Sequence, residues 1–390
     1  MVDRKILRGA SLVACVAAAF SSNAFGVIKN FDNGGADLKF LTPANWNDVV
    51  GADDDTLPGV NDRAVVNNNF VVTYNTAVTS TVNGLAIGAD WPVTGETGTD
   101  GTFNMTAGKI IVSGGGDSFV LARARGAVFG DADGDGVMNM TNAELQIGGS
   151  DPIVGVRDHG VLDIGLNARV YNTPGQENYW RLGNYGPSID AGLEGNGLLN
   201  VHSNGMFNAH VIFIGDNDAT GELRVSEQGS VVLTGNIVPR PSGGVQAGGS
   251  ATVRMTGSNA VLSAFNLESE SLAGEIRTKY IFDADAGGVS EIKLQDAINI
   301  TNNDLEVNLG VFVLPLNSSL LLFDGDQSLA GNRIFGTFTN LTVNGALNPA
   351  NYAVTYDQVN GDILLSAVPE PTAAMAVLGL AGMLIRRRRA

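Results

Sequence analysis

The chain has 390 residues, of which 44% are apolar, 7% aromatic and 16% charged, with 51 glycines against 12 prolines. This apolar content is enough to build a core, and it excludes a chain that is disordered over most of its length. The formal net charge of −17 at pH 7 argues against nucleic-acid binding, because an acidic body repels phosphate groups.

The first 24 residues are predicted to be a secretory signal peptide. Lys5 and Arg8 form a basic start, and an apolar stretch over residues 12–20 is followed by small residues. A lipoprotein signal lipidated at Cys15 is the alternative, but the apolar run continues past this cysteine. Cys15 is the only cysteine, so the mature chain would hold no disulfide or thiolate metal site. We therefore expect a protein exported through the secretion translocon.

Residues 27–95 are predicted to form an N-terminal β cap. They contain Trp46, a Pro-Gly turn and apolar strands at residues 64–66 and 70–74. They do not show the repeat pattern of the residues that follow. A cap at this end would cover the first open strand edge, which would otherwise invite aggregation.

Residues 96–275 contain an internal repeat. Six segments align without gaps, and in each a small first residue is followed by apolar third and fifth residues with a polar residue between them. This alternation is typical of a strand with one buried face. A turn and a second strand follow in each copy, and most copies are preceded by a third short apolar piece. The segments begin at Gly101, Gly136, Gly160, Gly197, Gly221 and Ala251.

The spacing of these starts indicates the fold class. It runs 35, 24, 37, 24 and 30 residues, so the unit length varies while the strand pattern holds. A solenoid accepts such variation at its corners, because each coil contacts mainly its neighbours; a propeller fits the shorter units poorly. We predict an all-β fold, a parallel β-solenoid (β-helix) with inward Leu, Met, Val and Ile and outward Asn, Arg, Asp and Thr. Residues 276–366 are expected to continue and close it. A pair of β-sandwiches is the alternative fold.

The last segment, residues 367–390, combines three features in order. An extended motif comes first, an apolar run over residues 372–385 follows, and an arginine cluster comes last. The run predicts a short apolar helix of about 21 Å at 1.5 Å per residue, against about 30 Å of bilayer hydrocarbon. It would therefore insert only marginally, with the arginines at the cytoplasmic surface. The motif is Val368, Pro369, Glu370 and Pro371, and the cluster is Arg386, Arg387, Arg388 and Arg389.

This tail resembles the PEP-CTERM sorting tail, also called the ice-binding protein C-terminal domain. The resemblance implies that an exosortase-type transpeptidase recognises the tail, cuts near the Pro-Glu-Pro motif and passes the protein to the cell surface or the extracellular matrix. The repeats also resemble the autotransporter-type β-helix rungs that accompany such tails. Together they imply an exported protein of the outer envelope or the extracellular space, with transient inner-membrane contact through the tail. A plain weak membrane anchor is the alternative for the tail.

Residues 130–145 hold the strongest candidate metal site. Acidic residues at loop positions one, three and five, a glycine at six, a carbonyl at seven and an amide at nine follow the pattern of a calcium loop. Position twelve is an asparagine rather than an acidic residue. The residues fit either a structural calcium site or a solvated acidic turn. The candidate ligands are Asp131, Asp133, Asp135, Val137 through its carbonyl, Asn139 and Asn142.

The sequence shows no catalytic constellation. The histidines at positions 159, 202 and 210 lack the spacing of a standard zinc site, and no nucleophile elbow, phosphate-binding loop or zinc-protease motif is found. We therefore expect a non-enzymatic structural or adhesive protein of the cell surface or matrix, with no cofactor beyond the candidate calcium.

Two alternative functions remain open. The first is a polysaccharide lyase or hydrolase on the β-helix scaffold, because such enzymes use clustered carboxylates and basic side chains along one face. The second is a glycan-binding protein whose partner is exopolysaccharide. The enzyme would use Asp131, Asp133, Asp163 and Arg157, and the glycan-binding protein would use Tyr179, Trp180 and Tyr185.

Overall fold

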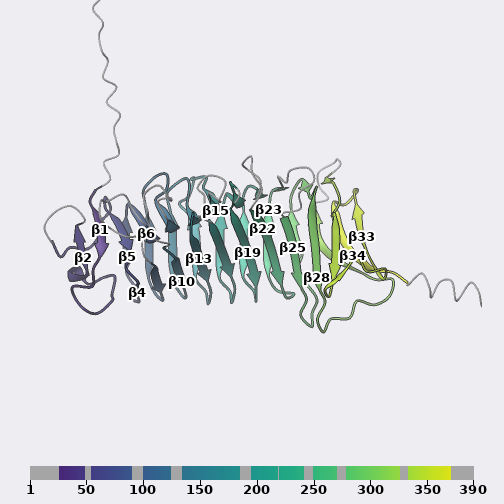
Figure 1. Cartoon of the computed structure of the whole chain (residues 1–390), viewed down its shortest axis with the longest axis horizontal. Helices are drawn as coiled ribbons and strands as arrows, with labels where there is room; N and C mark the ends of the chain where they lie inside the picture. The colour runs from purple at the N-terminus through teal and green to yellow at the C-terminus, as the bar shows by residue number, and fades with distance from the viewer. Residues whose placement is uncertain are drawn as a thin grey trace, which may run out of the picture.

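The computed structural model describes residues 26–48, 54–89, 100–123, 134–184, 195–217, 219–240, 249–269, 278–325 and 333–369. The strands wind into a rod of stacked coils, with the N-terminal residues at one end and the C-terminal residues at the other (Figure 1). The short helix in these ranges is a 3-10 turn at Pro43–Asn45. The predicted signal peptide and the predicted apolar helix of the tail lie outside the described residues.

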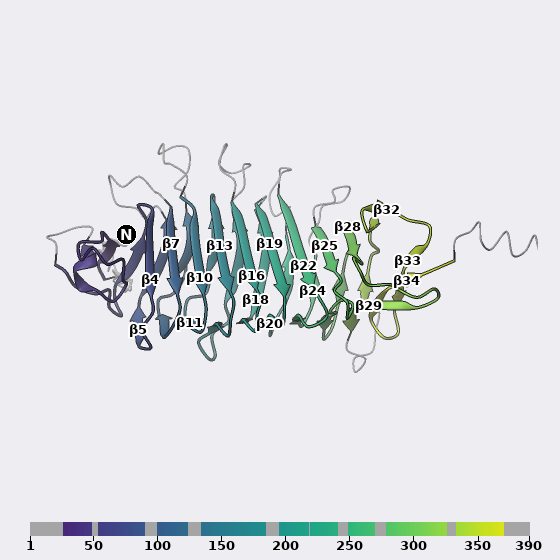
Figure 2. The ribbon, with the colours of Figure 1, turned by 90° about the horizontal axis from the view of Figure 1, so that it is seen from below.

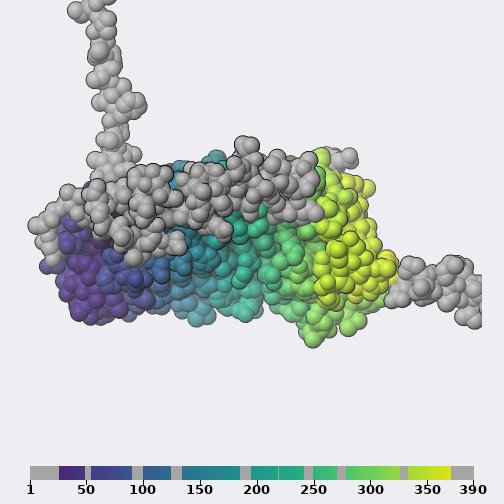
Figure 3. Space-filling model, viewed as in Figure 1, coloured from purple at the N-terminus to yellow at the C-terminus, as the bar shows by residue number. Residues whose placement is uncertain are grey.

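Three long sheets, which we name A, B and C, form the sides of the rod. The chain visits them in a fixed order, so that every third strand is a neighbour in the same sheet, and neighbouring coils pair in parallel. This is the topology of a parallel β-solenoid, and the predicted fold is confirmed. Figure 3 shows the coils as one solid body with the colour bands in sequence order.

Each sheet has a simple spatial order of strands along the rod. Sheet A contains β2 (Trp46–Asp48), β1 (Ile28–Phe31), β3 (Arg63–Val66), β6 (Gly84–Ala89), β9 (Phe119–Arg123), β12 (Ile153–Val156), β15 (Tyr179–Asn184), β18 (Val211–Asp216), β21 (Ile237–Pro239), β24 (Leu267–Glu268), β27 (Ile298–Asn299) and β30 (Ile334–Phe335). Sheet B contains β4 (Phe70–Tyr74), β7 (Gly101–Met105), β10 (Gly136–Met140), β13 (His159–Ile164), β16 (Asn196–Val201), β19 (Thr220–Ser226), β22 (Ser250–Thr256), β25 (Thr278–Asp283), β28 (Asn303–Asn308), β31 (Asn340–Val343) and β32 (Ala346–Leu347). Sheet C contains β5 (Thr79–Val82), β8 (Lys109–Val112), β11 (Glu144–Ile147), β14 (Arg169–Asn172), β17 (Met206–Ala209), β20 (Ser230–Leu233), β23 (Val261–Ala264), β26 (Ile292–Leu294), β29 (Ser319–Gly325), β34 (Asp362–Ala367) and β33 (Tyr352–Asp357).

The predicted repeat alignment matches the register of sheet B. The first residues of successive repeats lie opposite one another, as Gly136 does between Gly101 and Gly160. In sheet C the gapless alignment is wrong by one residue in the third to fifth copies, because Glu144 pairs with Arg169 rather than with the preceding alanine. It is wrong by two residues in the sixth copy, where Ser230 pairs with Val261. The corner between β13 and β14 holds one residue more than the corner between β10 and β11.

The small first residue of each repeat has a steric cause. Strands of sheet A contain a residue with positive φ near their ends, such as Gly183 at φ +71° in β15. This bend brings the sheet A backbone against the start of the sheet B strand, so a Cβ atom on Gly197 would lie 2.1 Å from the Gly183 nitrogen. Only glycine fits without a backbone shift at such a contact.

The core is a continuous column along the rod axis. The third and fifth residues of each repeat face inward and are fully buried, as Met138 and Met140 are in β10, while the residues between them face outward. Strands of sheet A differ, because every residue of β6 and of β12 is buried. Their continuous apolar runs are typical of strands that are covered on both faces.

Most of the length variation between coils falls at one corner. The connections from sheet A to sheet B range from the two residues 157–158 to the twelve residues 124–135. The corners from sheet B to sheet C, from β4 through β23, hold only three or four residues each. The unequal repeat spacing therefore reflects mainly one corner, and the coils keep their shape.

The solenoid begins earlier than the sequence pattern indicates. Strands β3, β4 and β5 already pair in parallel with β6, β7 and β8, so the first coil starts at Arg63 rather than after residue 95. The pattern misses this coil because Phe70 stands opposite Gly101, where later copies carry a small residue. The N-terminal cap is correspondingly smaller, and it consists of β1, β2 and the chain around them.

Each end of the rod is closed by antiparallel strands and buried aromatic rings. At the N-terminal end β1 pairs antiparallel with β2, and the Trp46 ring lies 4.8 Å from Phe40 and 5.3 Å from Phe31. At the C-terminal end β34 pairs antiparallel with β29 and with β33. There the Tyr280 ring lies 5.5 Å from Phe323. Figure 2 shows these caps at opposite ends of the stacked coils.

Candidate functional site

The predicted sorting motif begins where the folded body ends. Strand β34 ends at Ala367, and the next residue, Val368, donates its backbone N–H to the Asn351 carbonyl oxygen at 2.9 Å. Pro369 is exposed. The other motif positions, Glu370 and Pro371, and the arginine cluster Arg386, Arg387, Arg388 and Arg389 lie outside the described residues.

The predicted aromatic cluster is not formed as expected. Tyr179 and Trp180 are neighbours in β15, so their side chains point to opposite faces. Trp180 is 0% exposed, and its ring packs 4.9 Å from Phe207 and 5.6 Å from Phe119 in the core. Tyr179 faces outward and its ring lies 6.0 Å from His210. Trp180 therefore builds the fold and offers no surface to a glycan, and Tyr185 lies outside the described residues.

The six candidate calcium ligands do not form one loop. Val137 and Asn139 lie within the straight strand β10, which pairs with a strand on each side. This five-residue strand separates Asp135 from Asn142 by more than about 13 Å at 3.3 Å per residue, so both cannot bind one ion. The amide of Asn139 instead donates to the Asn104 side chain at 2.9 Å. Asp131 and Asp133 lie outside the described residues.

The outer face of sheet B carries amide and carboxylate side chains in its N-terminal half. Asn200 donates to Asp163 at 2.6 Å, and His202 Nε2 lies 3.2 Å from the other oxygen of the same carboxylate. Asp163 is thus engaged by its neighbours in the next coil. Arg157 lies before β13 begins, whereas Asp163 lies near the end of that strand, so these two residues of the alternative enzyme site lie apart along the chain. The other two, Asp131 and Asp133, lie outside the described residues.

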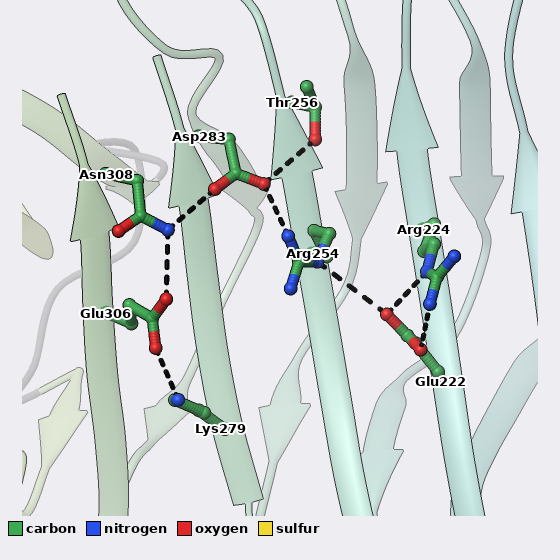
Figure 4. A network of polar contacts seen from close by, with 8 residues as sticks. All are labelled: Glu222, Arg224, Arg254, Thr256, Lys279, Asp283, Glu306 and Asn308. Atoms are coloured by element: carbon green, nitrogen blue, oxygen red, sulfur yellow. Dashed lines mark hydrogen bonds and ion pairs between the residues drawn. The ribbon is translucent and has the colours of Figure 1, made fainter. Parts of the chain in front are cut away.

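The same face carries an ion-pair network in its C-terminal half (Figure 4). Arg224 and Arg254 lie directly opposite each other in β19 and β22. Glu222 accepts two hydrogen bonds from Arg224, at 2.6 and 2.7 Å, and lies 3.7 Å from the Arg254 Nε atom. Arg254 also donates to Asp283 at 2.8 Å. The carboxylates thereby compensate two stacked like charges.

The network continues over the next coils. Lys279 pairs with Glu306, and Asn308 donates to Glu306 at 2.9 Å and to Asp283 at 2.8 Å. The hydrogen bond from Lys279, followed by that from Asn308, lowers the pKa of Glu306 below its ordinary value. These charges satisfy one another, so this face stabilises the stacking of coils more readily than it binds a charged ligand.

A groove of about 810 Å³ lies on the outer face of sheet C, and the sequence did not reveal it. Outward residues of β14, β17 and β20 form its floor, and the turn over residues 173–177 forms one wall. The residues in these strands are about thirty positions apart in sequence, so only the coil register brings them together. The polar side chains that line it include Glu144, Tyr171, Asn172, Glu177, Asn208 and His210.

The groove offers hydrogen-bonding groups that the protein does not use. The side-chain oxygens of Asn172 and Asn208 are buried, and within the described ranges they have no hydrogen-bond partner. The Tyr171 hydroxyl donates to Glu144 at 2.9 Å, which holds the ring in place. His210 Nδ1 lies 3.0 Å from the Thr234 hydroxyl. Amide side chains beside a fixed ring suit a neutral ligand rich in hydroxyl groups.

Within the described part of the chain, no group of three His, Cys, Asp or Glu side chains is placed to hold a metal ion. A bilayer-crossing helix is likewise not found in the described ranges. Comparison with models of known protein families gives no match, and no curated protein or solved structure matches the chain either.

Proposed function

We propose that this protein is a non-enzymatic, exported structural or adhesive rod of the cell surface or extracellular matrix. The observation that carries the proposal is the relation between the rod and the tail. The last strand ends at Ala367, and the exposed Pro369 follows within two residues. A processing enzyme could therefore reach the Pro-Glu-Pro motif without unfolding any coil.

The construction of the rod supports the same role. Each coil contacts mainly its neighbours, so the fold provides length and a regular outer surface. Antiparallel strands end the parallel stacking, with β2 beside β1 at one end and β34 beside β29 at the other, so the regular parallel edge of these two sheets is covered there. The outward side chains of sheet B pair between coils, which suits a durable spacer. An exosortase-type transpeptidase and the secretion translocon are the proposed partners.

Mass spectrometry of the C-terminal peptide, from native envelope and culture fractions, tests the proposal. We expect peptides that end near Pro369 to Pro371, and a Glu370→Ala variant that keeps its full tail. A tail that stays intact through Arg389 in the membrane fraction would contradict processing and leave a simple anchor.

A second candidate function, glycan binding, is favoured by the groove on sheet C. The two unpartnered amide oxygens of Asn172 and Asn208, both within the described residues, supply the specific observation. We expect Asn208→Ala to weaken binding to isolated exopolysaccharide several-fold, because one hydrogen bond of about 1 kcal/mol is lost. Asn139→Ala on sheet B is the matched amide control. Equal binding by both variants would remove the groove as a glycan site.

A further inference from the structure

The C-terminal cap exposes apolar side chains to a degree found nowhere else in the described residues. The large apolar side chains that are more than 60% exposed all lie between residues 311 and 359. Three of them belong to one connection, residues 309–318, which joins β28 to β29. We call this connection the apolar loop. The five side chains are Val311 (80%), Val313 (81%), Leu316 (63%), Leu347 (65%) and Val359 (86%).

The apolar loop is held in shape by the protein. Leu309 and Leu314 are buried, and the Leu309 N–H donates to the Asn344 side chain at 2.7 Å. Phe312 packs against the core and donates its N–H to the Leu309 carbonyl at 2.8 Å. Val311 and Val313 lie on either side of this anchor and point away from the core. Their exposure is thus built into the fold.

The apolar loop lies beside the exit of the tail. The Asn317 N–H donates to the Ala367 carbonyl at 3.0 Å, and the Ala367 N–H donates to the Ser318 carbonyl at 3.0 Å. The loop and the chain leaving β34 lie at the same end of the rod in both ribbon views (Figures 1 and 2). The first residue of the sorting motif is therefore one position beyond a direct contact with the loop.

We propose that the apolar loop contacts the surface of a lipid bilayer at the end of the rod from which the tail leaves. This inference deepens the proposed function, since it depends on the tail bringing this end to a membrane. The tail predicts an apolar run of 14 residues, 372–385, that is too short to span the hydrocarbon comfortably. A second apolar contact would supplement such a weak anchor, as stable attachment generally needs two signals.

The small area of the apolar loop and its lack of charged residues favour a bilayer over a second protein. Val311, Val313 and Leu316 form too small an area for a stable dimer, which buries about 800 Å² per partner. Residues 309–318 carry no charge, whereas the whole chain has a net charge of −17. An anionic membrane would repel the acidic rod. The uncharged loop can enter the interface while the body stays in water.

Vesicle flotation of the full chain tests the proposal. We compare the wild type with a Val311→Ser, Val313→Ser, Leu316→Ser triple variant, on vesicles of phosphatidylcholine alone and with phosphatidylglycerol. We expect the variant to lose about tenfold or more in binding on both, because apolar burial does not depend on lipid charge. The matched control is Val359→Ser, which removes one apolar side chain of similar exposure. Val359 precedes β34, whereas Ala367, which contacts the apolar loop, is the last residue of this six-residue strand. We therefore expect vesicle binding by the control to change by less than about twofold.

The outcomes separate this inference from the proposed function. A chain ending at Pro369 keeps the loop without the tail, and we expect its weak binding to be lost on adding the triple substitution. If the triple variant floats like the wild type while the shortened chain does not float, the tail acts alone and the inference is overturned. If sedimentation without vesicles shows a wild-type dimer and a monomeric variant, a second copy covers the loop and the inference also fails. Unchanged thermal unfolding of the variant confirms that it folds.

Discussion

The two ends of the rod are closed in the same manner but present different surfaces. Both are plugged by buried aromatic rings, Trp46 at one end and Tyr280 at the other. Beside Trp46, Lys29 pairs with Asp48 at 2.7 Å and with Asp54 at 2.8 Å. Among the described residues of this end, no large apolar side chain is more than 55% exposed. Beside Tyr280 the surface carries the exposed apolar side chains of the C-terminal cap. Closing a solenoid therefore does not require apolar side chains that are more than 60% exposed, and their presence at one end alone supports the proposed membrane contact.

Removing the aromatic ring that fills the N-terminal end should have the largest effect on the free energy of unfolding. We expect Trp46→Ala to lower the free energy of unfolding by about 3–5 kcal/mol, because a large ring is lost from a packed site. The Trp46 Nε1–H also loses its hydrogen bond to the Phe40 carbonyl, 2.6 Å away. Denaturant unfolding followed by circular dichroism measures the loss. Val359→Ala at the other end serves as the control, with a change within about 0.5 kcal/mol. Similar losses in the two variants would contradict the comparison.

A change at Tyr280, the ring that fills the C-terminal end, should alter the free energy of unfolding by less and in the opposite direction. The Tyr280 hydroxyl is buried and has no hydrogen-bond partner within the described residues, and burial raises the pKa of this phenol. Tyr280→Phe keeps the ring and removes the unsatisfied group, so we expect a gain of about 1 kcal/mol. Denaturant unfolding again provides the measurement, with Tyr74→Phe as the matched control. Tyr74 Oη donates to the Val78 carbonyl at 3.1 Å, so its removal should destabilise. A loss in Tyr280→Phe would reveal a partner for the hydroxyl.

The smallest expected effect is a pH dependence confined to the N-terminal cap. Hydrogen bonds from the Thr42 hydroxyl and the Asn45 amide lower the pKa of Asp37 to about 2. An unfolded aspartate has a pKa of about 3.9. The stabilisation from Asp37 is therefore present above about pH 4 and is lost as the pH falls toward 2. An NMR titration of the Asp37 carboxyl checks the value, and Asp37→Asn should flatten the pH dependence of cap stability in this window. A titration midpoint near 4 would contradict the prediction.

The coils could be predicted because burial acts on the sequence with a fixed period. Residues such as Leu162 and Ile164 must face inward, and a small residue must stand where Gly197 meets Gly183. The first coil was missed because Phe70 takes the small residue's place without disturbing the strand pairing. Apolar alternation thus identifies most coils. At the ends of the rod fewer neighbouring coils constrain each position, so the residue types there follow the repeat pattern less closely.

The candidate sites were harder to predict than the fold. Neighbours in a strand point to opposite faces, so the period-two rule itself separates Tyr179 from Trp180. The calcium-loop spacing takes no account of strand pairing, and strand pairing keeps Asn139 within β10. The groove left no local signal, and the apolar run at residues 311–316 looks in the sequence like part of a buried strand. The depth of the groove depends on the register of three coils. The exposure of Val313 depends on how the loop over residues 309–318 packs against the core.

The parallel ladders also set the mechanical character of the rod. The strands run across the rod, so the hydrogen bonds that join neighbouring coils are directed nearly parallel to the rod axis. Nine coils from β3 to β29 stack in this direction, with a rise of about 4.8 Å each, or roughly 43 Å in all. A pull between the two ends loads the coil interfaces in series, as links of a chain are loaded. The strength of the whole rod under tension is then that of its weakest interface, whatever the number of coils.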